Sequence, residues 1–223
     1  MVSELLGQER MIENKDWATL LFVFSFAVIA LTKSAFEVRF SDYSKLIVSD
    51  KYNKIYKESA QLWSWFNINL TFVQFISISF FIQLILSYFH FASKYDWIVF
   101  IQIVVFSAVF VLSKFLIEKI IAVAFGFEDL IEQYNLQKVN YRTYISLCLL
   151  PINMTLYYIN NLSLSVIYLL ITLVLIANLL TYLNSLKIYQ KFIIGKIFYF
   201  ILYLCTLEIA PYYFVYYWFT QKQ

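Results

Sequence analysis

The chain alternates between long runs without charged residues and shorter segments rich in Lys, Arg, Asp and Glu. An α-helix rises about 1.5 Å per residue, so about 20 apolar residues cross the hydrocarbon layer of a bilayer. The run from Thr143 to Leu186 is too long for one crossing, and Asn160-Asn161 near its middle predicts a turn between two helices. The pattern therefore predicts six transmembrane helices, at about residues 17–32, 66–88, 97–113, 143–159, 162–183 and 197–219.

Composition points to the same class of protein. Of the 223 residues, 62% are hydrophobic and 14% are charged, whereas a soluble domain carries about 25% charged residues. A globule of this size cannot bury so much apolar surface, so lipid must cover it. The loops are short, and the sequence contains no Gly/Ser/Pro-rich linker and no internal repeat. We expect one all-α membrane domain over residues 1–223, a polytopic transmembrane helical bundle.

Lysine and arginine are distributed unevenly between the two sides of the predicted bundle. Of the 17 basic residues, 13 lie in the first, third and fifth loops and 4 lie on the opposite side. Because cytoplasmic loops are enriched in Lys and Arg, these three loops are predicted to be cytoplasmic and both termini periplasmic. The 13 residues are Lys33, Arg39, Lys45, Lys51, Lys54, Lys57, Lys114, Lys119, Lys138, Arg142, Lys187, Lys191 and Lys196.

The first predicted loop, residues 33–58, contains an apolar stripe at helical spacing among lysines. One interpretation is an amphipathic helix that lies on the bilayer and binds anionic headgroups. The other is a docking surface for a cytoplasmic partner, and the two are compatible. The stripe consists of Phe36, Phe40, Tyr43 and Ile47, and the docking candidates also include Lys51 and Lys54.

Few polar residues fall inside the predicted spans, and Glu208 is the most conspicuous. A lone ionised carboxylate at that depth costs several kcal/mol, so Glu208 is expected to be neutral or paired. Pro211 follows it, and Pro151 lies close to Asn153 in the fourth span. Two proline-kinked helices with polar residues near mid-depth could line a small cavity. Alternatively, Glu208 is a protonated hydrogen-bond donor that holds helices together.

The remaining candidates for chemistry are weak. Lys114 and Glu118 form an i,i+4 pair at the inner end of the third span, which is predicted to continue as a helix past Glu118. His90 is the only histidine and no ligand cluster surrounds it in the sequence, so neither a metal site nor a cofactor is expected. With 3 Gly in the chain and no catalytic motif, we expect neither a phosphate-binding loop nor an enzyme. The basic charge is membrane-proximal, which favours anionic lipid over nucleic acid as a partner.

The segment from Lys196 to Pro211 (KIFYFILYLCTLEIAP) resembles the C-terminal signature of a family of unknown function. That family comprises small six-helix inner-membrane proteins of Bacteroidota-type bacteria. Phe36, Phe40 and the Lys51-Tyr52-Asn53 segment before Trp63 are also similar to it, as are the total length and number of spans. The resemblance implies a location in the bacterial inner membrane and, by association, a role accessory to protein secretion or gliding.

Three functions remain open at this point. The first is a non-catalytic accessory or assembly subunit of an inner-membrane complex, which the missing catalytic motifs and the amphipathic loop favour. The second is a small proton- or ion-coupled transporter that uses Glu208. The third is a membrane-embedded enzyme acting on lipid, for which Asn153 and Cys205 are poor second catalytic groups. We expect the first, with lipid and other membrane subunits as partners.

The distribution of basic residues predicts the side on which the chain ends. A reporter that is active only outside the cytoplasm should be active when it is fused after Gln223. The matched control is a reporter that is active only in the cytoplasm, fused at the same position. Activity of that control would contradict the arrangement with six spans and both termini outside.

Overall fold

A computed structural model describes residues 15–46, 52, 55–56, 64–126, 128–159 and 164–193; for residues 121, 125, 129–131, 133 and 182–193 it describes the backbone alone. Within those ranges the chain forms six α-helices and no β-strand, which confirms the predicted all-α class. The helices are α1 (Asp16–Ala35), α2 (Glu37–Ser44), α4 (Trp65–Tyr88), α5 (Trp97–Phe125), α6 (Glu128–Tyr158) and α7 (Leu164–Ile193).

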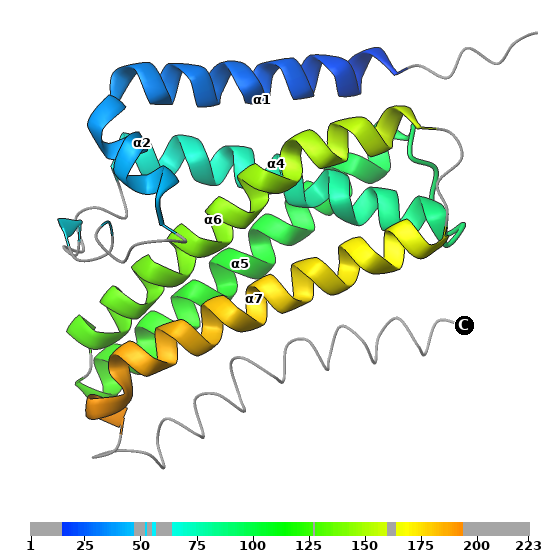
Figure 1. Cartoon of the computed structure of the whole chain (residues 1–223). Coiled ribbons are helices and arrows are strands. Elements are labelled where there is room, and N and C mark those ends of the chain that lie inside the picture. Colours follow the sequence, from blue (N-terminus) through cyan, green and yellow to red (C-terminus); the bar gives the residue numbers. More distant parts are fainter. Residues whose placement is uncertain are drawn as a thin grey trace, which may run out of the picture.

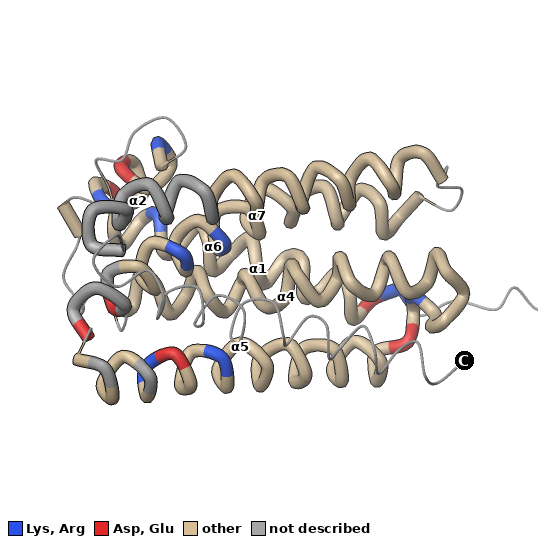
Figure 2. The backbone as a smooth tube through the Cα atoms, turned by 90° about the horizontal axis from the view of Figure 1, so that it is seen from below, with Lys and Arg blue, Asp and Glu red and all other residues tan. Residues whose placement is uncertain are grey.

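The five long helices run back and forth, so that each points opposite to the next in sequence, and the short α2 lies at one end (Figure 1). Helix α4 packs against α1, α5 and α6, while α6 packs against α4, α5 and α7. Helices α4 and α6 are therefore central, and the other three long helices flank them. Charged residues are concentrated in the half of the bundle that carries α2, where they extend along α5 and α6, and a smaller group lies at the opposite end (Figure 2).

Four of the described helices are long and apolar enough to cross a membrane: α1, α4, α5 as far as Ala124, and α7 as far as Thr181. The expected fourth span, residues 143–159, corresponds to the C-terminal part of α6, which begins earlier than predicted, at Glu128, ends at Tyr158 and is more polar than the other long helices. Its flanking helices shield much of α6, so it does not need an apolar surface. The expected sixth span, 197–219, lies outside the described residues, so a count of six stays a prediction.

Local signals explain where the helices begin and end. Asp96 caps α5, because its Oδ1 accepts a hydrogen bond from the backbone N–H of Ile98 at 2.9 Å. Ser64 caps α4 in the same way through the N–H of Asn67, at 3.4 Å. At the other end of α5, Gly126 has a φ of 69°, a left-handed conformation that glycine adopts without steric cost. Helix α5, which contains the expected third span, therefore ends at residue 125, well past Glu118 as predicted.

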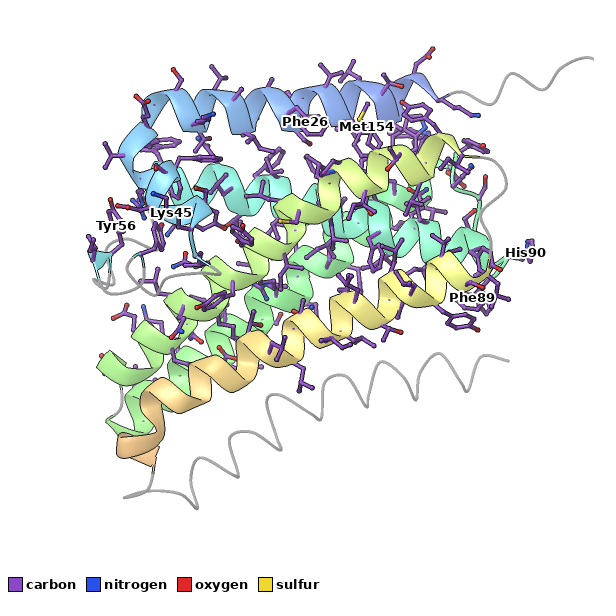
Figure 3. All side chains as sticks on the ribbon, viewed as in Figure 1. Phe26, Lys45, Tyr56, Phe89, His90 and Met154 are labelled. Carbon is purple, nitrogen blue, oxygen red and sulfur yellow. The ribbon has the colours of Figure 1, made fainter. Side chains whose placement is uncertain are left out.

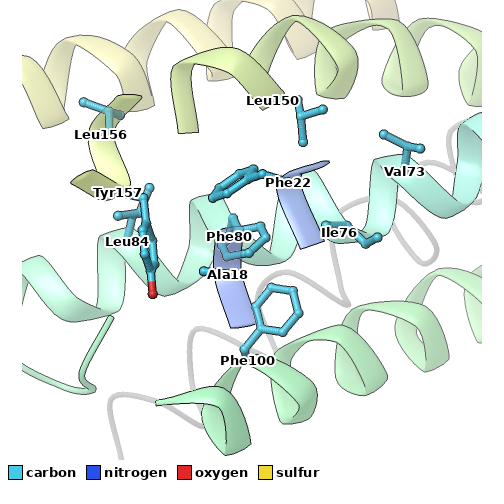
Figure 4. Close-up of a cluster of buried hydrophobic side chains, with 10 residues drawn as sticks. All are labelled: Ala18, Phe22, Val73, Ile76, Phe80, Leu84, Phe100, Leu150, Leu156 and Tyr157. Carbon is cyan, nitrogen blue, oxygen red and sulfur yellow. The ribbon is translucent and has the colours of Figure 1, made fainter. Parts of the chain in front are cut away.

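The main hydrophobic core joins α1, α4, α5 and α6 through aromatic rings (Figure 4). Phe80 on α4 is fully buried at its centre. Its ring centroid lies 4.2 Å from that of Phe22, 4.5 Å from that of Phe100 and 5.9 Å from those of Trp17 and Tyr157. Since neighbouring helices in lipid gain little from apolar transfer, close packing of such rings holds the bundle together.

This arrangement predicts that replacing one phenylalanine of α4 by alanine lowers the free energy of unfolding strongly, whereas replacing another lowers it little. Phe80→Ala should lower the free energy of unfolding by about 3 kcal/mol, because it opens a cavity among four rings. Phe72→Ala is the matched control: the Phe72 side chain is 51% exposed and makes one edge contact with Phe24. Unfolding in mixed micelles measures both variants, and equal losses would contradict the proposed core.

Candidate functional site: a polar seam between α4 and α6

Helices α4 and α6 meet along a row of buried, uncharged polar side chains. On α4, Gln74 and Ser77 are three residues apart and therefore share a face. On α6, spacings of three and seven residues likewise place three polar residues on the face toward α4. All are at most 3% exposed. We call this row the polar seam; it consists of Gln74, Ser77, Thr143, Ser146 and Asn153.

Hydrogen bonds between the two helices run along the seam. The Thr143 hydroxyl donates to Oε1 of Gln74 at 2.6 Å. The Ser77 hydroxyl donates to the carbonyl oxygen of Ser146 at 2.7 Å, and Asn153 Nδ2 donates to the carbonyl oxygen of Ser77 at 2.8 Å. These bonds connect residues 69 to 76 positions apart in sequence, so they fix the register of α4 against α6.

Pro151 lies in the same stretch of α6, between Ser146 and Asn153. Proline has no N–H, so the carbonyl of Leu147 loses its helical donor. One residue earlier, the Ser146 carbonyl accepts the Ser77 hydroxyl from α4. Pro151 itself is exposed, and its carbonyl accepts the Thr155 hydroxyl at 2.9 Å. The candidates Asn153 and Pro151 thus lie on one stretch of α6, with Asn153 in the seam and Pro151 outside it.

Two seam atoms have no hydrogen-bond partner among the described residues: the donor Gln74 Nε2 and the acceptor Asn153 Oδ1. Both side chains are completely buried. A donor and an acceptor of this kind suit a neutral polar group rather than a charged one. The seam contains no titratable side chain, so it can join helices or contact a neutral polar molecule but cannot transfer protons through its own side chains.

A second polar contact, between α5 and α6, is charged. Lys138 Nζ lies 3.4 Å from Oε1 of Glu118, and the Glu118 side chain is 4% exposed. Lys138 also lies over the ring of Tyr134, 5.6 Å from its centroid. The sequence suggested Lys114, four residues earlier on the same helix, as a partner of Glu118 and did not indicate Lys138. No local pattern identifies Lys138, since it lies 20 residues away on the next helix.

Three aromatic residues of the first-loop stripe, Phe36, Phe40 and Tyr43, pack against the helical bundle. Tyr43 on α2 is 1% exposed, its ring centroid lies 5.6 Å from that of Phe66, and its hydroxyl donates to the carbonyl of Asn140 at 3.0 Å. Burial raises the pKa of Tyr43 well above its ordinary value, which keeps this hydroxyl protonated as a donor. Phe36 and Phe40 also contact the Phe66 ring, edge to face.

Arg39 contacts the same group of aromatic rings around Phe66, although the sequence marked it only as one of the basic residues of the first loop. Its guanidinium is 4.6 Å from the ring centroid of Phe66 and 4.9 Å from that of Tyr56, and its Nε donates to the Tyr52 hydroxyl at 3.2 Å. Such cation–aromatic contacts are a favourable environment for a partly buried arginine. Lys45 and Tyr56 lie at this end of the bundle, and Phe89 and His90 lie at the other (Figure 3).

The other candidates fall outside the part of the chain that the structure describes. They are Glu208 and Pro211 in the expected sixth span, and Ile47, Lys51 and Lys54 in the first loop. A cavity between two kinked helices therefore stays a prediction. Among the described residues, no group of three or more His, Cys, Asp or Glu side chains could hold a metal ion.

Comparison with known proteins gives one match. A family model described as "Domain of unknown function (DUF4271)" covers residues 18–219. No curated protein and no solved structure matches the chain. The family match spans the polar seam and nearly all of the described helices, and it assigns no activity to them.

The seam predicts a measurable coupling between two side chains that are far apart in sequence. In a double-mutant cycle, Gln74→Ala and Thr143→Ala should couple by about 0.6–1.7 kcal/mol in the free energy of unfolding. The control cycle combines Thr143→Ala with Asn178→Ala, because Asn178 donates only within its own helix, to the Val174 carbonyl. We expect no coupling there. Equal coupling in both cycles would contradict the hydrogen bond across the seam.

Proposed function

The chain belongs to the family described as a domain of unknown function (DUF4271), and we propose that it is a non-catalytic accessory or assembly subunit of an inner-membrane protein complex. Four described helices that are long and apolar enough to cross a membrane support a membrane location. The bacterial inner membrane, and a role accessory to secretion or gliding machinery of the cell envelope, rest on the sequence resemblance.

The observation that carries the proposal is the chemistry of the polar seam. Catalysis by acids, bases or nucleophiles needs titratable or activated side chains that lie close together. The seam instead contains amides and hydroxyls that bond across α4 and α6. Among the described acids, Glu118 is the buried one, and it contacts Lys138. An interior of this kind supports a role in joining helices.

We further propose that both termini are periplasmic and that the α2 end of the bundle faces the cytoplasm. The uneven distribution of Lys and Arg along the sequence supports this orientation. In the described part of the chain, Lys33, Arg39 and Lys45 lie at the α2 end, whereas Lys15 precedes α1 and Lys94 precedes α5 at the other end. A basic end of this kind would bind anionic lipid headgroups.

A second candidate function is a small proton- or ion-coupled transporter that uses Glu208. One observation favours it: Gln74 Nε2 and Asn153 Oδ1 have no partner among the described residues, although both side chains are buried. Leaving such groups unpaired costs about 1–3 kcal/mol each, which a bound polar molecule would offset. The seam would then contribute neutral contacts, and Glu208 the titratable group.

Purification in mild detergent tests the subunit role. The tagged chain, extracted gently from its own membranes, should migrate as part of a larger assembly that contains different polypeptides in fixed ratios. An unrelated tagged multi-pass protein from the same membranes controls for non-specific capture. A monodisperse particle of this chain alone that binds an ion or solute would contradict the subunit role and favour transport.

Substitution of Glu208 separates the two functions in the same preparation. If Glu208 donates a hydrogen bond between helices, Glu208→Gln keeps the donor and should assemble normally, whereas Glu208→Ala should cost about 1–2 kcal/mol of stability. If Glu208 cycles protons, both variants should assemble but lose function. A correctly assembled Gln variant without function would therefore contradict the structural role of Glu208.

A further inference from the structure

Helix α5 exposes a continuous apolar ridge along nearly its whole length. The exposed ridge residues follow one another at intervals of three, four, four, three, four, four and three positions. This 11-residue repeat is close to the period of a straight α-helix, so the ridge runs parallel to the helix axis. We call it the α5 ridge; it consists of Ile98, Ile101, Val105, Val109, Leu112, Leu116, Ile120 and Val123, each between 44% and 67% exposed.

Near its C-terminal end, α5 buries an acidic side chain and exposes large apolar side chains, and the exposed charged residue there is Lys119. After Lys114 the helix buries Glu118 and Ala122, at 3% and 2% exposure, while Leu116 and Ile120 are 56% and 67% exposed. Glu118 turns toward α6, where it contacts Lys138. In water, the charge would face outward and the apolar side chains inward.

The ridge also differs in composition from a typical contact surface between membrane helices. Such contacts favour Gly, Ala, Ser and Thr, because small residues allow the backbones to approach closely. The α5 ridge contains only Ile, Val and Leu. Bulky aliphatic side chains of this kind match fluid acyl chains.

The length of the ridge sets the path of α5 through the membrane. From Ile98 to Val123 it extends about 37 Å, whereas the hydrocarbon layer is roughly 30 Å thick. A tilt of about 37° from the membrane normal brings the whole ridge into the hydrocarbon, within the range seen for transmembrane helices. In Figure 1, α5 runs at a slant to α1, a helix of 20 residues and therefore about 30 Å.

We propose that bilayer acyl chains cover the entire α5 ridge as far as Val123, so that α5 crosses the membrane obliquely and the Glu118–Lys138 ion pair lies within the hydrocarbon layer. Glu118 precedes Val123 by five residues, which places its backbone about 6 Å inside the hydrocarbon edge at this tilt. Lys119, which is exposed on the flank of the ridge, reaches the headgroups along its aliphatic stem. The inference is independent of the proposed subunit role.

Spin labels on single cysteines test the proposal in the full chain. The chain carries Cys148→Ser and Cys205→Ser and is reconstituted in vesicles of phosphatidylethanolamine and phosphatidylglycerol. Labels are compared at Leu116→Cys and Ile120→Cys on the ridge, at Ala122→Cys on the buried face of the same turn, and at Glu128→Cys on the exposed first turn of α6. Each label is probed with oxygen, which concentrates in hydrocarbon, and with a water-soluble nickel chelate.

The three environments give three distinct results. We expect the labels at Leu116 and Ile120 to be severalfold more accessible to oxygen than to nickel, the label at Glu128 to show the reverse, and the label at Ala122 to be shielded from both. Accessibility to nickel at Leu116 and Ile120 equal to that at Glu128 would overturn the proposal, because α5 would then project into water. Shielding from both reagents would also overturn it, because a second protein surface rather than lipid would cover the ridge.

Discussion

Polar groups inside a lipid-covered bundle must find hydrogen-bond partners within the protein, and α6 imposes this constraint on its neighbours. Lipid supplies neither donors nor acceptors, so the buried amides and hydroxyls of α6 depend on partners within the protein, on α6 itself or on another helix. Helix α4 provides two of them, Gln74 and Ser77, at the spacing that α6 requires. The central pair of helices therefore has one register, and α1, α5 and α7 pack around it.

Aromatic clusters hold the bundle on either side of the polar seam. One cluster surrounds Phe80 and fastens α1 and α5 to the central pair. The other surrounds Phe66, where Tyr43 joins α2 to α6 through the carbonyl of Asn140. Aromatic rings suit both places, because they fill space with specific edge-to-face contacts where apolar transfer contributes little. The high content of Phe and Tyr therefore has a structural use in this fold.

The interior contains two kinds of polar contact between helices, one neutral and one charged. In the seam, neutral amides and hydroxyls join helices without the large desolvation cost of an ion. Between α5 and α6, the carboxyl group of Glu118 and the amino group of Lys138 form an ion pair at 3.4 Å. A helix that buries its acid can expose a long apolar ridge, as α5 does. The proposed subunit role is consistent with such an interior, in which polar groups join helices.

The sequence by itself determined which segments are helical and apolar, because backbone hydrogen bonds and hydrophobic runs are local properties. It located α1, α4, α5 and α7, the break between α6 and α7, and Asn153 as a polar residue inside a helix. The stripe of Phe36, Phe40 and Tyr43 was also visible. Periodicity, however, shows which face of a helix is apolar and does not show whether lipid or protein covers it.

Only the tertiary structure decided which residues are hydrogen-bond or ion-pair partners across helices. Asn153 bonds to Ser77, 76 residues away, and Tyr43 bonds to Asn140, 97 residues away. Glu118 contacts Lys138 on the neighbouring helix, a partner that the local i,i+4 spacing to Lys114 does not reveal. Such pairings depend on which helices become neighbours and at what register, and these follow from packing over the whole bundle. Polarity follows the same logic, because a helix enclosed by other helices, such as α6, can be polar where one that faces lipid cannot.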